Sequence, residues 1–208
     1  MEFDAAKAAF VAVDLQRAFC GEDGSTAANG RDISHCQTAA ARCVEVAAAA
    51  HRVGMRVIWT RFVLRPDYAD GGIMTDHMRP WIREHGALRS GTTDIELIAE
   101  AEAEVTPADF VIDKPRYSSF YATSLEAILR ASSIECLMVG GLTTSMCVES
   151  TVRDAAQRDY KTFLVRDACG DYWPDRHDAS LEAIGFGFAR VISHNEAIAA
   201  IDAGKAAF

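Results

Sequence analysis

The sequence predicts an α/β fold: a three-layer, doubly wound, six-stranded parallel sheet with helices on both faces. Short, almost wholly apolar runs of the kind that form doubly buried strands alternate with helix-forming runs along the whole chain. The chain has 208 residues, 50% of them hydrophobic and 25% charged, which is enough for one ordinary core and surface. We expect residues 1–208 to form a single domain, because no linker or internal repeat divides them.

Six runs have the apolar character of buried parallel strands. In chain order they are Phe10–Asp14, Met55–Phe62, Phe110–Asp113, Cys136–Gly140, Thr162–Val165 and Arg190–Ile192. The helices expected between and after them are Ile33–Val53, Asp94–Glu104, a helix that opens at Thr123, Ser145–Arg158, Asp175–Gly185 and Asn195–Ala203. Each strand is thus followed by a helix, as the crossover connections of a parallel sheet require.

Local signals mark the ends of two helices. The alanine-rich run Ile33–Val53 has Asp32 or Ser34 as a candidate N-cap and Gly54 where a left-handed residue ends a helix. A T-x-x-E capping box opens the helix at Thr123.

The segment Val63–Thr93 is long for a loop in a compact domain. Loops of that length are usually functional or partly structured. We therefore expect this segment to cover a functional site or a subunit contact.

The composition excludes several classes of protein. Lys and Arg number 21 against 30 Asp and Glu, a formal net charge of −9, so we expect neither nucleic acid nor a membrane surface as a partner. The amino-terminal apolar run is broken by Asp14 and lacks the basic residues of a signal peptide, and no apolar stretch approaches the roughly 18 residues of a membrane helix. We expect a cytoplasmic protein whose 6 cysteines, with no C-x-x-C pair, stay reduced.

Three polar residues follow strands whose carboxyl ends should meet at one edge of the sheet, where open α/β sheets bind ligands. They are Asp14, Lys114 and Cys147. Cys147 follows the run Gly140–Met146 at the expected start of a helix, whose positive end favours a thiolate. Asp14 could take the thiol proton and return it to a leaving group, while Lys114 holds both negative charges in place. The glycine turn could aim backbone N–H groups into an oxyanion hole.

Each of the three residues also has an ordinary structural explanation. An aspartate at a strand end is more often a cap or an ion-pair partner, and a lone lysine is usually at the surface. A cysteine after two glycines is most often a small buried hydrophobe. The occurrence of all three at one edge of the sheet favours a catalytic site.

The segments around these positions resemble a known family. VAVDLQRAF, DKPRYSSFYAT and VGGLTTSMCVESTVRDA are similar, in order and spacing, to the signature segments of the isochorismatase-like cysteine hydrolases, and the resemblance covers nearly the whole chain. It implies a single isochorismatase-like hydrolase domain in which Asp14, Lys114 and Cys147 are the catalytic triad. It also implies a cis peptide between Leu142 and Thr143, and an oxyanion hole formed by the N–H groups of Thr143 and Cys147.

Within the family, K-P-R-Y-S-x-F and G-L-T-T-S-M-C-V-E-S-T look most like the amidohydrolases of ureido and carbamoyl compounds, including ureidoacrylate and biuret hydrolases. The residues we expect to bind substrate are Phe19, Tyr117, Phe120 and Trp173. Tyr117 would donate a hydrogen bond to a substrate carbonyl, although each of these aromatic residues would also serve in the core. Arg116 could bind a substrate carboxylate, but a surface or interface ion pair is the more common role.

The resemblance also indicates whether a metal ion is to be expected in the site. Nicotinamidases of this family carry an Asp-x-His pair and further histidines after the second strand, where this chain reads TRFVLRPDYADGGI. His77 and His85 do not have the i, i+4 spacing of a helical metal site. We therefore expect no metal and no other cofactor.

These observations predict a cysteine-dependent, metal-independent amidohydrolase that releases ammonia from a small-molecule substrate through a thioester intermediate. Two alternatives stay open: a non-amide hydrolase of the isochorismatase type that leaves Cys147 passive, and a non-catalytic binding or scaffold protein. The presence of Cys147 favours amide chemistry, because the isochorismate hydrolases of the family lack a cysteine there. We also expect a homo-oligomer, a dimer or a tetramer, because members of the family commonly assemble.

Overall fold

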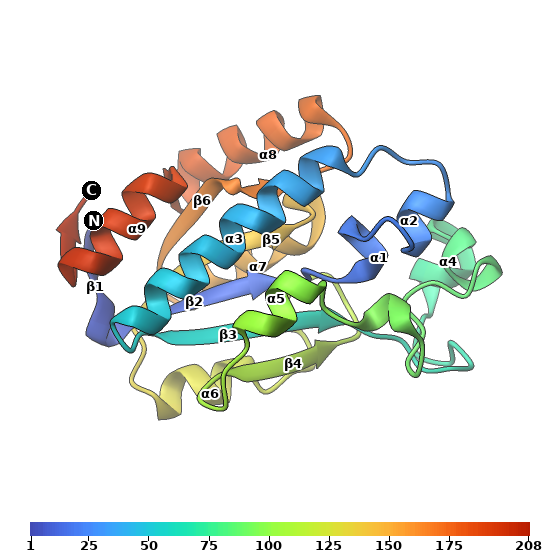
Figure 1. The fold of residues 1–208 in the computed structure, drawn as a ribbon, viewed down its shortest axis with the longest axis horizontal. Coiled ribbons are helices and arrows are strands. Elements are labelled where there is room, and N and C mark those ends of the chain that lie inside the picture. The colour runs from blue at the N-terminus through green and yellow to red at the C-terminus, as the bar shows by residue number, and fades with distance from the viewer.

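The computed structural model describes residues 1–208 and contains the predicted sheet. Six parallel strands lie in the order β4-β3-β2-β5-β6-β7 (Figure 1). Their bounds are β2 Ala8–Val13, β3 Arg56–Phe62, β4 Phe110–Lys114, β5 Cys136–Leu142, β6 Lys161–Gly170 and β7 Arg190–Ile192. The prediction of a six-stranded, doubly wound parallel sheet is confirmed, and every predicted strand is present. The strand β6 continues to Gly170 rather than ending at Val165.

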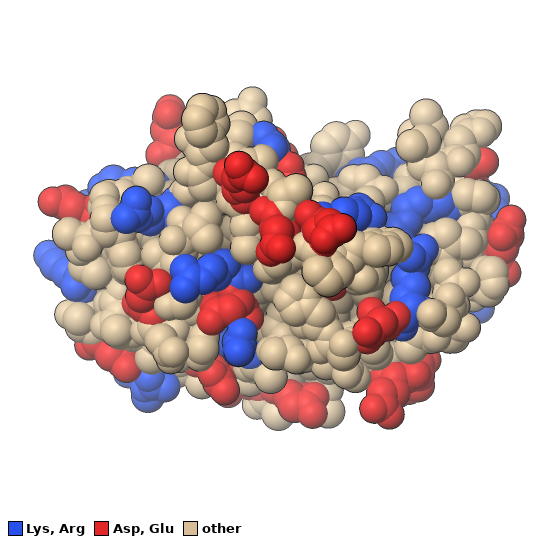
Figure 2. Space-filling model, turned by 90° about the horizontal axis from the view of Figure 1, so that it is seen from above, with Lys and Arg blue, Asp and Glu red and all other residues tan.

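Helices cover both faces of the sheet (Figure 1). One face carries α3 Ser34–Arg52, α5 Ala99–Glu104 and α9 His194–Ala203, and the other carries α6 Leu125–Ala131, α7 Glu149–Ala156 and α8 Pro174–Gly187. None of the helices is both long and apolar enough to cross a membrane. Acidic and basic side chains are interspersed over the surface seen from above (Figure 2).

The predicted ends of α3 agree with the structure. Asp32 accepts a hydrogen bond from the backbone N–H of Ser34 at 2.9 Å, and Gly54 follows the helix with a positive φ of 71°. The capping box at Thr123 is wrong, because α6 begins only at Leu125. The Thr123 hydroxyl accepts from the N–H of Leu125 at 3.2 Å and donates to the carbonyl of Ser119 at 2.6 Å.

Two other predicted helices are shorter than expected. The run Asp94–Glu104 contains a 3₁₀ turn, Thr93–Ile95, before α5 begins, because Leu97 forms a β-bridge with Gln16. The run Ser145–Arg158 starts with a π-helical turn, Thr144–Val148, and becomes α-helical at α7.

The remaining elements did not appear in the prediction. The two ends of the chain pair as a separate antiparallel sheet of β1 Glu2–Asp4 and β8 Lys205–Ala207. The short helices are α1 Arg17–Cys20, α2 Ser25–Ala28 and α4 Trp81–Glu84, with a 3₁₀ turn Ala5–Lys7 and a π-helical turn Met74–Met78.

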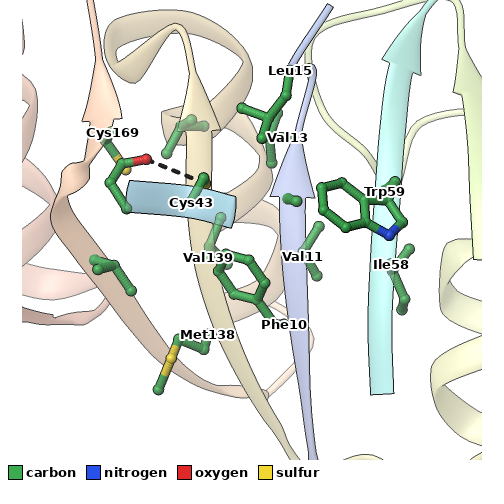
Figure 3. Packing of buried hydrophobic residues seen from close by; sticks show 14 of the residues in the cluster. Phe10, Val11, Val13, Leu15, Cys43, Ile58, Trp59, Met138, Val139 and Cys169 are labelled. Carbon is green, nitrogen blue, oxygen red and sulfur yellow. Dashed lines mark hydrogen bonds between the residues drawn. The ribbon is translucent and has the colours of Figure 1, made fainter. Parts of the chain in front are cut away.

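The hydrophobic core lies on both faces of the sheet, and Figure 3 shows the part around the central strands and α3. Phe10, Val11, Ile58 and Trp59 are fully buried on the central strands β2 and β3. The thiol of Cys43, on α3, donates to the carbonyl of Ala168 at 3.4 Å, so this cysteine is packed into the helix–sheet contact.

A glycine allows the central strands to approach closely at their carboxyl ends. Gly141 of β5 lies opposite Val13 of β2 with a φ of 131°, and a Cβ atom at Gly141 would lie 2.1 Å from the Val13 carbonyl oxygen. A side chain at this position would therefore push β5 away from β2. The glycine keeps the ends of these two strands, and the residues that follow them, side by side.

Candidate active site

The three predicted catalytic residues meet at the carboxyl edge of the sheet. In the strand order, β2 and β5 are the neighbours at which the chain switches direction across the sheet, the usual place for a ligand in an open α/β fold. Asp14 directly follows β2, Lys114 ends β4, and Cys147 lies in the turn after β5. The structure thus brings together the residues that the sequence placed at this edge.

Asp14 is held by contacts on both carboxylate oxygens. Its Oδ1 accepts a 2.7 Å hydrogen bond from the hydroxyl of Thr60, and its Oδ2 lies 2.7 Å from Nζ of Lys114. Oδ2 accepts no hydrogen bond of good geometry, so its contact with Lys114 is an ion pair. This leaves Oδ2 as the oxygen with capacity to take up a proton.

Lys114 reaches Asp14 by crossing the intervening strand β3. Its Nζ lies 4.6 Å from the centre of the Phe62 ring and donates to the carbonyls of Arg116 and Tyr117 at 3.1 and 3.0 Å. Burial lowers the pKa of Lys114, but the charges of Asp14 and Cys147 outweigh it, and the pKa is raised overall. The side chain therefore stays a cation inside the protein.

The thiol of Cys147 lies beside both charged groups, which act on its pKa in opposite directions. Burial raises the pKa of this thiol to about 12, Lys114 lowers it, and Asp14 raises it. Burial outweighs the charge of Lys114. Cys147 rests as a thiol and needs a base before it can attack a substrate.

The backbone before Cys147 contains the expected cis peptide, between Leu142 and Thr143. The carbonyl of Thr143 accepts from the N–H groups of Met146 and Val148 at 3.1 and 3.2 Å, whereas the Thr143 N–H has no acceptor in the protein. A backbone donor next to the thiol is thus unused.

Polar residues that the sequence analysis did not single out hold this turn. Asp171, which follows β6, accepts from the N–H and the hydroxyl of Ser145 at 2.9 and 2.6 Å. The hydroxyl of Thr144 lies 2.8 Å from Nδ1 of His177. Burial, followed by the charge of His35, lowers the pKa of His177, so its ring is neutral and can accept from Thr144.

A narrow pocket leads to Cys147. Apart from Cys147 itself, its lining consists of Phe19, Ser25, Phe62, Arg79, Trp81, Ile82, Leu88, Tyr117, Thr143, Met146 and Tyr172. Of the predicted substrate-binding residues, Phe19 and Tyr117 therefore lie in the pocket wall. The lining is mostly apolar, as is typical of sites for small molecules.

The other predicted substrate-binding residues lie elsewhere. Phe120 packs against the ring of Tyr160, 6.0 Å between ring centres, and does not line the pocket. Trp173 is 41% exposed and lines a second hollow beside the pocket. Arg116 donates to the carbonyl of Asp70 at 2.8 Å, so it attaches the segment Val63–Thr93 to the site and makes no ion pair.

The segment Val63–Thr93 covers the pocket, one of the two roles expected for it. It contributes Arg79, Trp81, Ile82 and Leu88 to the lining. Its fold is maintained by the hydroxyl of Tyr68, which donates to the carbonyl of Ala87 at 2.8 Å. A single aspartate, Asp94, accepts from Leu88 and from Ser25 and so joins the segment to α2.

The histidines of this segment do not form a metal site. His77 and His85 are both exposed, and Nδ1 of His85, the residue after α4, lies 3.0 Å from the carbonyl of Trp81. No group of three or more His, Cys, Asp or Glu side chains in the structure is placed to hold a metal ion.

The chain also matches known proteins in sequence and in fold. The family model described as Isochorismatase domain matches residues 8–196. The chain belongs to the isochorismatase family. The resemblance of its three signature segments is thereby confirmed. This isochorismatase family member is 35% identical over 178 residues to the ureidoacrylate amidohydrolase RutB of Methylorubrum extorquens, a match that covers 80% of this chain and 71% of that protein.

Solved structures of the family have the same fold. A cysteine hydrolase from Pseudomonas syringae superimposes with a TM-score of 0.87 and is 27% identical, covering 97% of this chain and 95% of that one. The N-carbamoylsarcosine amidase of Thermoplasma acidophilum superimposes with a TM-score of 0.72 and is 28% identical, covering 91% of this chain and 97% of that one.

Proposed function

We propose that this isochorismatase family member is a cysteine-dependent amidohydrolase that releases ammonia from a small ureido or carbamoyl amide. The chain is a hydrolase of C–N bonds other than peptide bonds, the activity shared by the names of its ureidoacrylate and N-carbamoylsarcosine relatives. The observation that carries the cysteine mechanism is the buried pair of Asp14 and Lys114, 2.7 Å apart, beside the thiol that ends the pocket.

In the first half of the reaction, Oδ2 of Asp14 takes the proton of the Cys147 thiol, and the sulfur attacks the carbonyl carbon of the substrate. The raised pKa of Cys147 makes this base necessary. The unused N–H of Thr143, with the N–H of Cys147, would donate to the developing oxyanion. Asp14 then returns the proton to the leaving nitrogen, the C–N bond breaks, and ammonia departs.

In the second half, water attacks the carbonyl carbon that is bonded to sulfur. Asp14 accepts a proton of that water and passes it to the sulfur as the C–S bond breaks, which regenerates the thiol. Lys114 stays protonated throughout because Asp14 and Cys147 raise its pKa. Its ammonium stabilises whichever of the two groups carries the negative charge.

The substrate class follows from the size and chemistry of the pocket. A narrow, mostly apolar space admits a small planar amide, and Tyr117 in its wall carries a hydroxyl that could bind a polar group. The ureido class is favoured by the K-P-R-Y-S segment and by the names of the relatives, which concern ureido and carbamoyl compounds.

The experiment that tests the proposal is a measurement of ammonia release from ureidoacrylate, biuret, N-carbamoyl amino acids, maleamate and nicotinamide. We expect turnover of a ureido or carbamoyl compound to be fastest and to be lost in Cys147→Ala. The matched control is Cys43→Ala, since Cys43 is fully buried on α3 and packs against β6 outside the site. Fastest turnover of nicotinamide or maleamate would contradict the substrate class, and activity retained by Cys147→Ala would contradict the mechanism.

A further inference from the structure

Arg79 is the only residue with a formal charge in the wall of the pocket. Two other arginines of the same segment are paired: Arg65 lies 3.1 Å from Asp67, and Arg83 lies 2.8 Å from Asp76. Arg79 makes no ion pair. Its one hydrogen bond runs from Nη1 to the thioether sulfur of Met146 at 3.5 Å, a weak acceptor. Most of its N–H donors are therefore available to a ligand.

Further unpaired arginines surround the hollow that opens beside the pocket, which we call the outer hollow. The outer hollow shares Arg79, Trp81, Thr143, Met146 and Tyr172 with the pocket and adds Arg31, Met78, Asp171, Trp173 and Arg176. The guanidinium groups of Arg31 and Arg176 lie 4.6 and 4.7 Å from the centre of the Trp173 ring. Nε of Arg31 is buried without a hydrogen-bond partner.

The one acidic residue of the outer hollow does not neutralise these arginines. Asp171 is 2% exposed, and its two carboxylate oxygens accept from Ser145 and from the N–H of Tyr172. The rest of the chain is acidic, with a net charge of −9. In the view from above, basic side chains form a band toward the end of the molecule that carries α2 and α4 (Figure 2). The outer hollow thus has three arginines and one acidic residue in its lining, on a protein whose net charge is −9.

We propose that the substrate carries a carboxylate group and that Arg79 binds this group while Cys147 attacks the amide carbon. The inference rests on the proposed function and narrows its substrate class to ureido or carbamoyl acids. Arg79 contacts Met146, the residue before Cys147, so an anion bound by Arg79 lies in the same small pocket as the thiol. A guanidinium can pair with a carboxylate through two parallel hydrogen bonds, and an apolar wall strengthens such a pair.

A carboxylate-binding role for Arg79 distinguishes between substrates that all contain a ureido group. Biuret carries no carboxylate and would leave Arg79 without a partner in the pocket wall, whereas a ureido acid would supply one. Arg31 and Arg176, at the entrance, would attract the anion before it binds. Their contribution would appear in the association rate and would weaken as salt is added.

The test compares N-carbamoyl-β-alanine with its methyl ester, which lacks the negative charge and carries one added methyl group. We expect kcat/KM to favour the acid in the wild type, and Arg79→Gln to lower this acid-over-ester ratio by about 30-fold or more. Arg79→Lys should restore part of the ratio, because it restores the charge without the paired hydrogen bonds. The matched control is Arg89→Gln, an exposed arginine of the same segment outside both the pocket and the outer hollow.

The outcomes separate this inference from the proposed function. If the wild type turns over maleamate and no ureido compound, the proposed substrate class is wrong, and the same comparison of maleamate with its methyl ester decides the role of Arg79. Equal kcat/KM for acid and ester in the wild type, or an unchanged ratio in Arg79→Gln, would overturn the inference. Calorimetric binding of N-carbamoyl-β-alanine to Cys147→Ala gives a readout without turnover: a Kd that is unaffected by Arg79→Gln would likewise overturn it.

Discussion

Nζ of Lys114 lies 2.7 Å from Oδ2 of Asp14, and the side chains of both residues are fully buried. The two residues are on strands that are not neighbours, since β3 lies between β4 and β2. Burying two charges is costly, and here the cost is offset by Thr60 on Asp14 and by backbone carbonyls on Lys114. Such a pair stabilises the protein only while both members are present.

Removal of the ammonium alone should therefore harm both stability and catalysis. We expect Lys114→Met to lower the free energy of unfolding by about 3–5 kcal/mol, because it leaves the carboxylate of Asp14 buried without a counter-charge. We expect kcat to fall by about 10³-fold or more in the same variant. Urea unfolding and ammonia release measure the two effects. The control is Lys161→Met, at an exposed lysine at the start of β6.

The double variant Asp14→Asn/Lys114→Met provides a second check on the pair. Its stability should exceed the value expected from adding the two single effects, because the uncompensated charge is gone. A Lys114→Met protein that unfolds within about 1 kcal/mol of wild type and keeps kcat within about tenfold would show that the pair is not the centre of the site.

The reactivity of Cys147 should respond in opposite directions to its two charged neighbours. Asp14 raises the pKa of the thiol and Lys114 lowers it. At pH 7.5, Asp14→Asn should therefore react faster with iodoacetamide than wild type, and Lys114→Met should react more slowly. Peptide mass spectrometry of the labelled protein measures both rates.

Among the six cysteines of the wild type, Cys147 should be labelled first. Burial raises the pKa of every one of these thiols, so access to reagent decides the order, and Cys147 borders the pocket. Labelling spread evenly over the six residues would argue against a pocket that leads to Cys147.

The sheet could be predicted because a doubly buried parallel strand is apolar at nearly every residue. This pattern can be recognised from the residues of the strand alone. The end of α3 could also be predicted from a local signal, because Gly54 adopts the positive φ that favours glycine. The pairing of β1 with β8 was not predictable. Those strands are short and lie at opposite ends of the chain, and no local pattern links them.

The catalytic edge could also be predicted, since Asp14, Lys114 and Cys147 interrupt or follow apolar strands where polar residues are conspicuous. The residues that form the wall of the pocket could not be predicted from the sequence. Arg79 and Trp81 come from a segment of short turns with no periodic pattern, and an aromatic residue such as Phe120 has the same sequence signal in a pocket and in a core. One signal was available but unused: Thr60, the polar residue inside the apolar strand β3, holds Asp14.

A further prediction concerns the stability of the protein as a function of pH. Near the end of α3, Nδ1 of His51 lies 2.7 Å from Glu104 and Nε2 lies 3.0 Å from Asp109. Burial lowers the pKa of His51, but the hydrogen bonds to Glu104 and Asp109 outweigh it and raise the pKa above its ordinary value of 6.5. The protonated ring therefore stabilises the folded protein fully below pH 6.5, and this stabilisation is lost as the pH rises through the folded-state pKa.

The measurement is the free energy of unfolding of wild type and His51→Gln between pH 5 and 9. The variant should be less stable by about 1.5–3 kcal/mol at the acidic end, where hydrogen bonds to charged groups are lost, and the difference should shrink as the pH rises. His85→Gln, at an exposed histidine, should show no such trend. A difference that is constant or grows with pH would contradict the assignment.

The central claim is that Cys147 becomes covalently bonded to the substrate carbon. The most direct test is acid quenching of the enzyme during turnover of a ureido or carbamoyl amide, followed by mass spectrometry of the intact protein and of its peptides. The account predicts an added acyl or carbamoyl mass on the peptide that contains Cys147, absent from Cys147→Ala, whose kcat is lower by about 10³-fold or more. Turnover by Cys147→Ala within about tenfold of wild type, with no added mass on that peptide in the active enzyme, would contradict it.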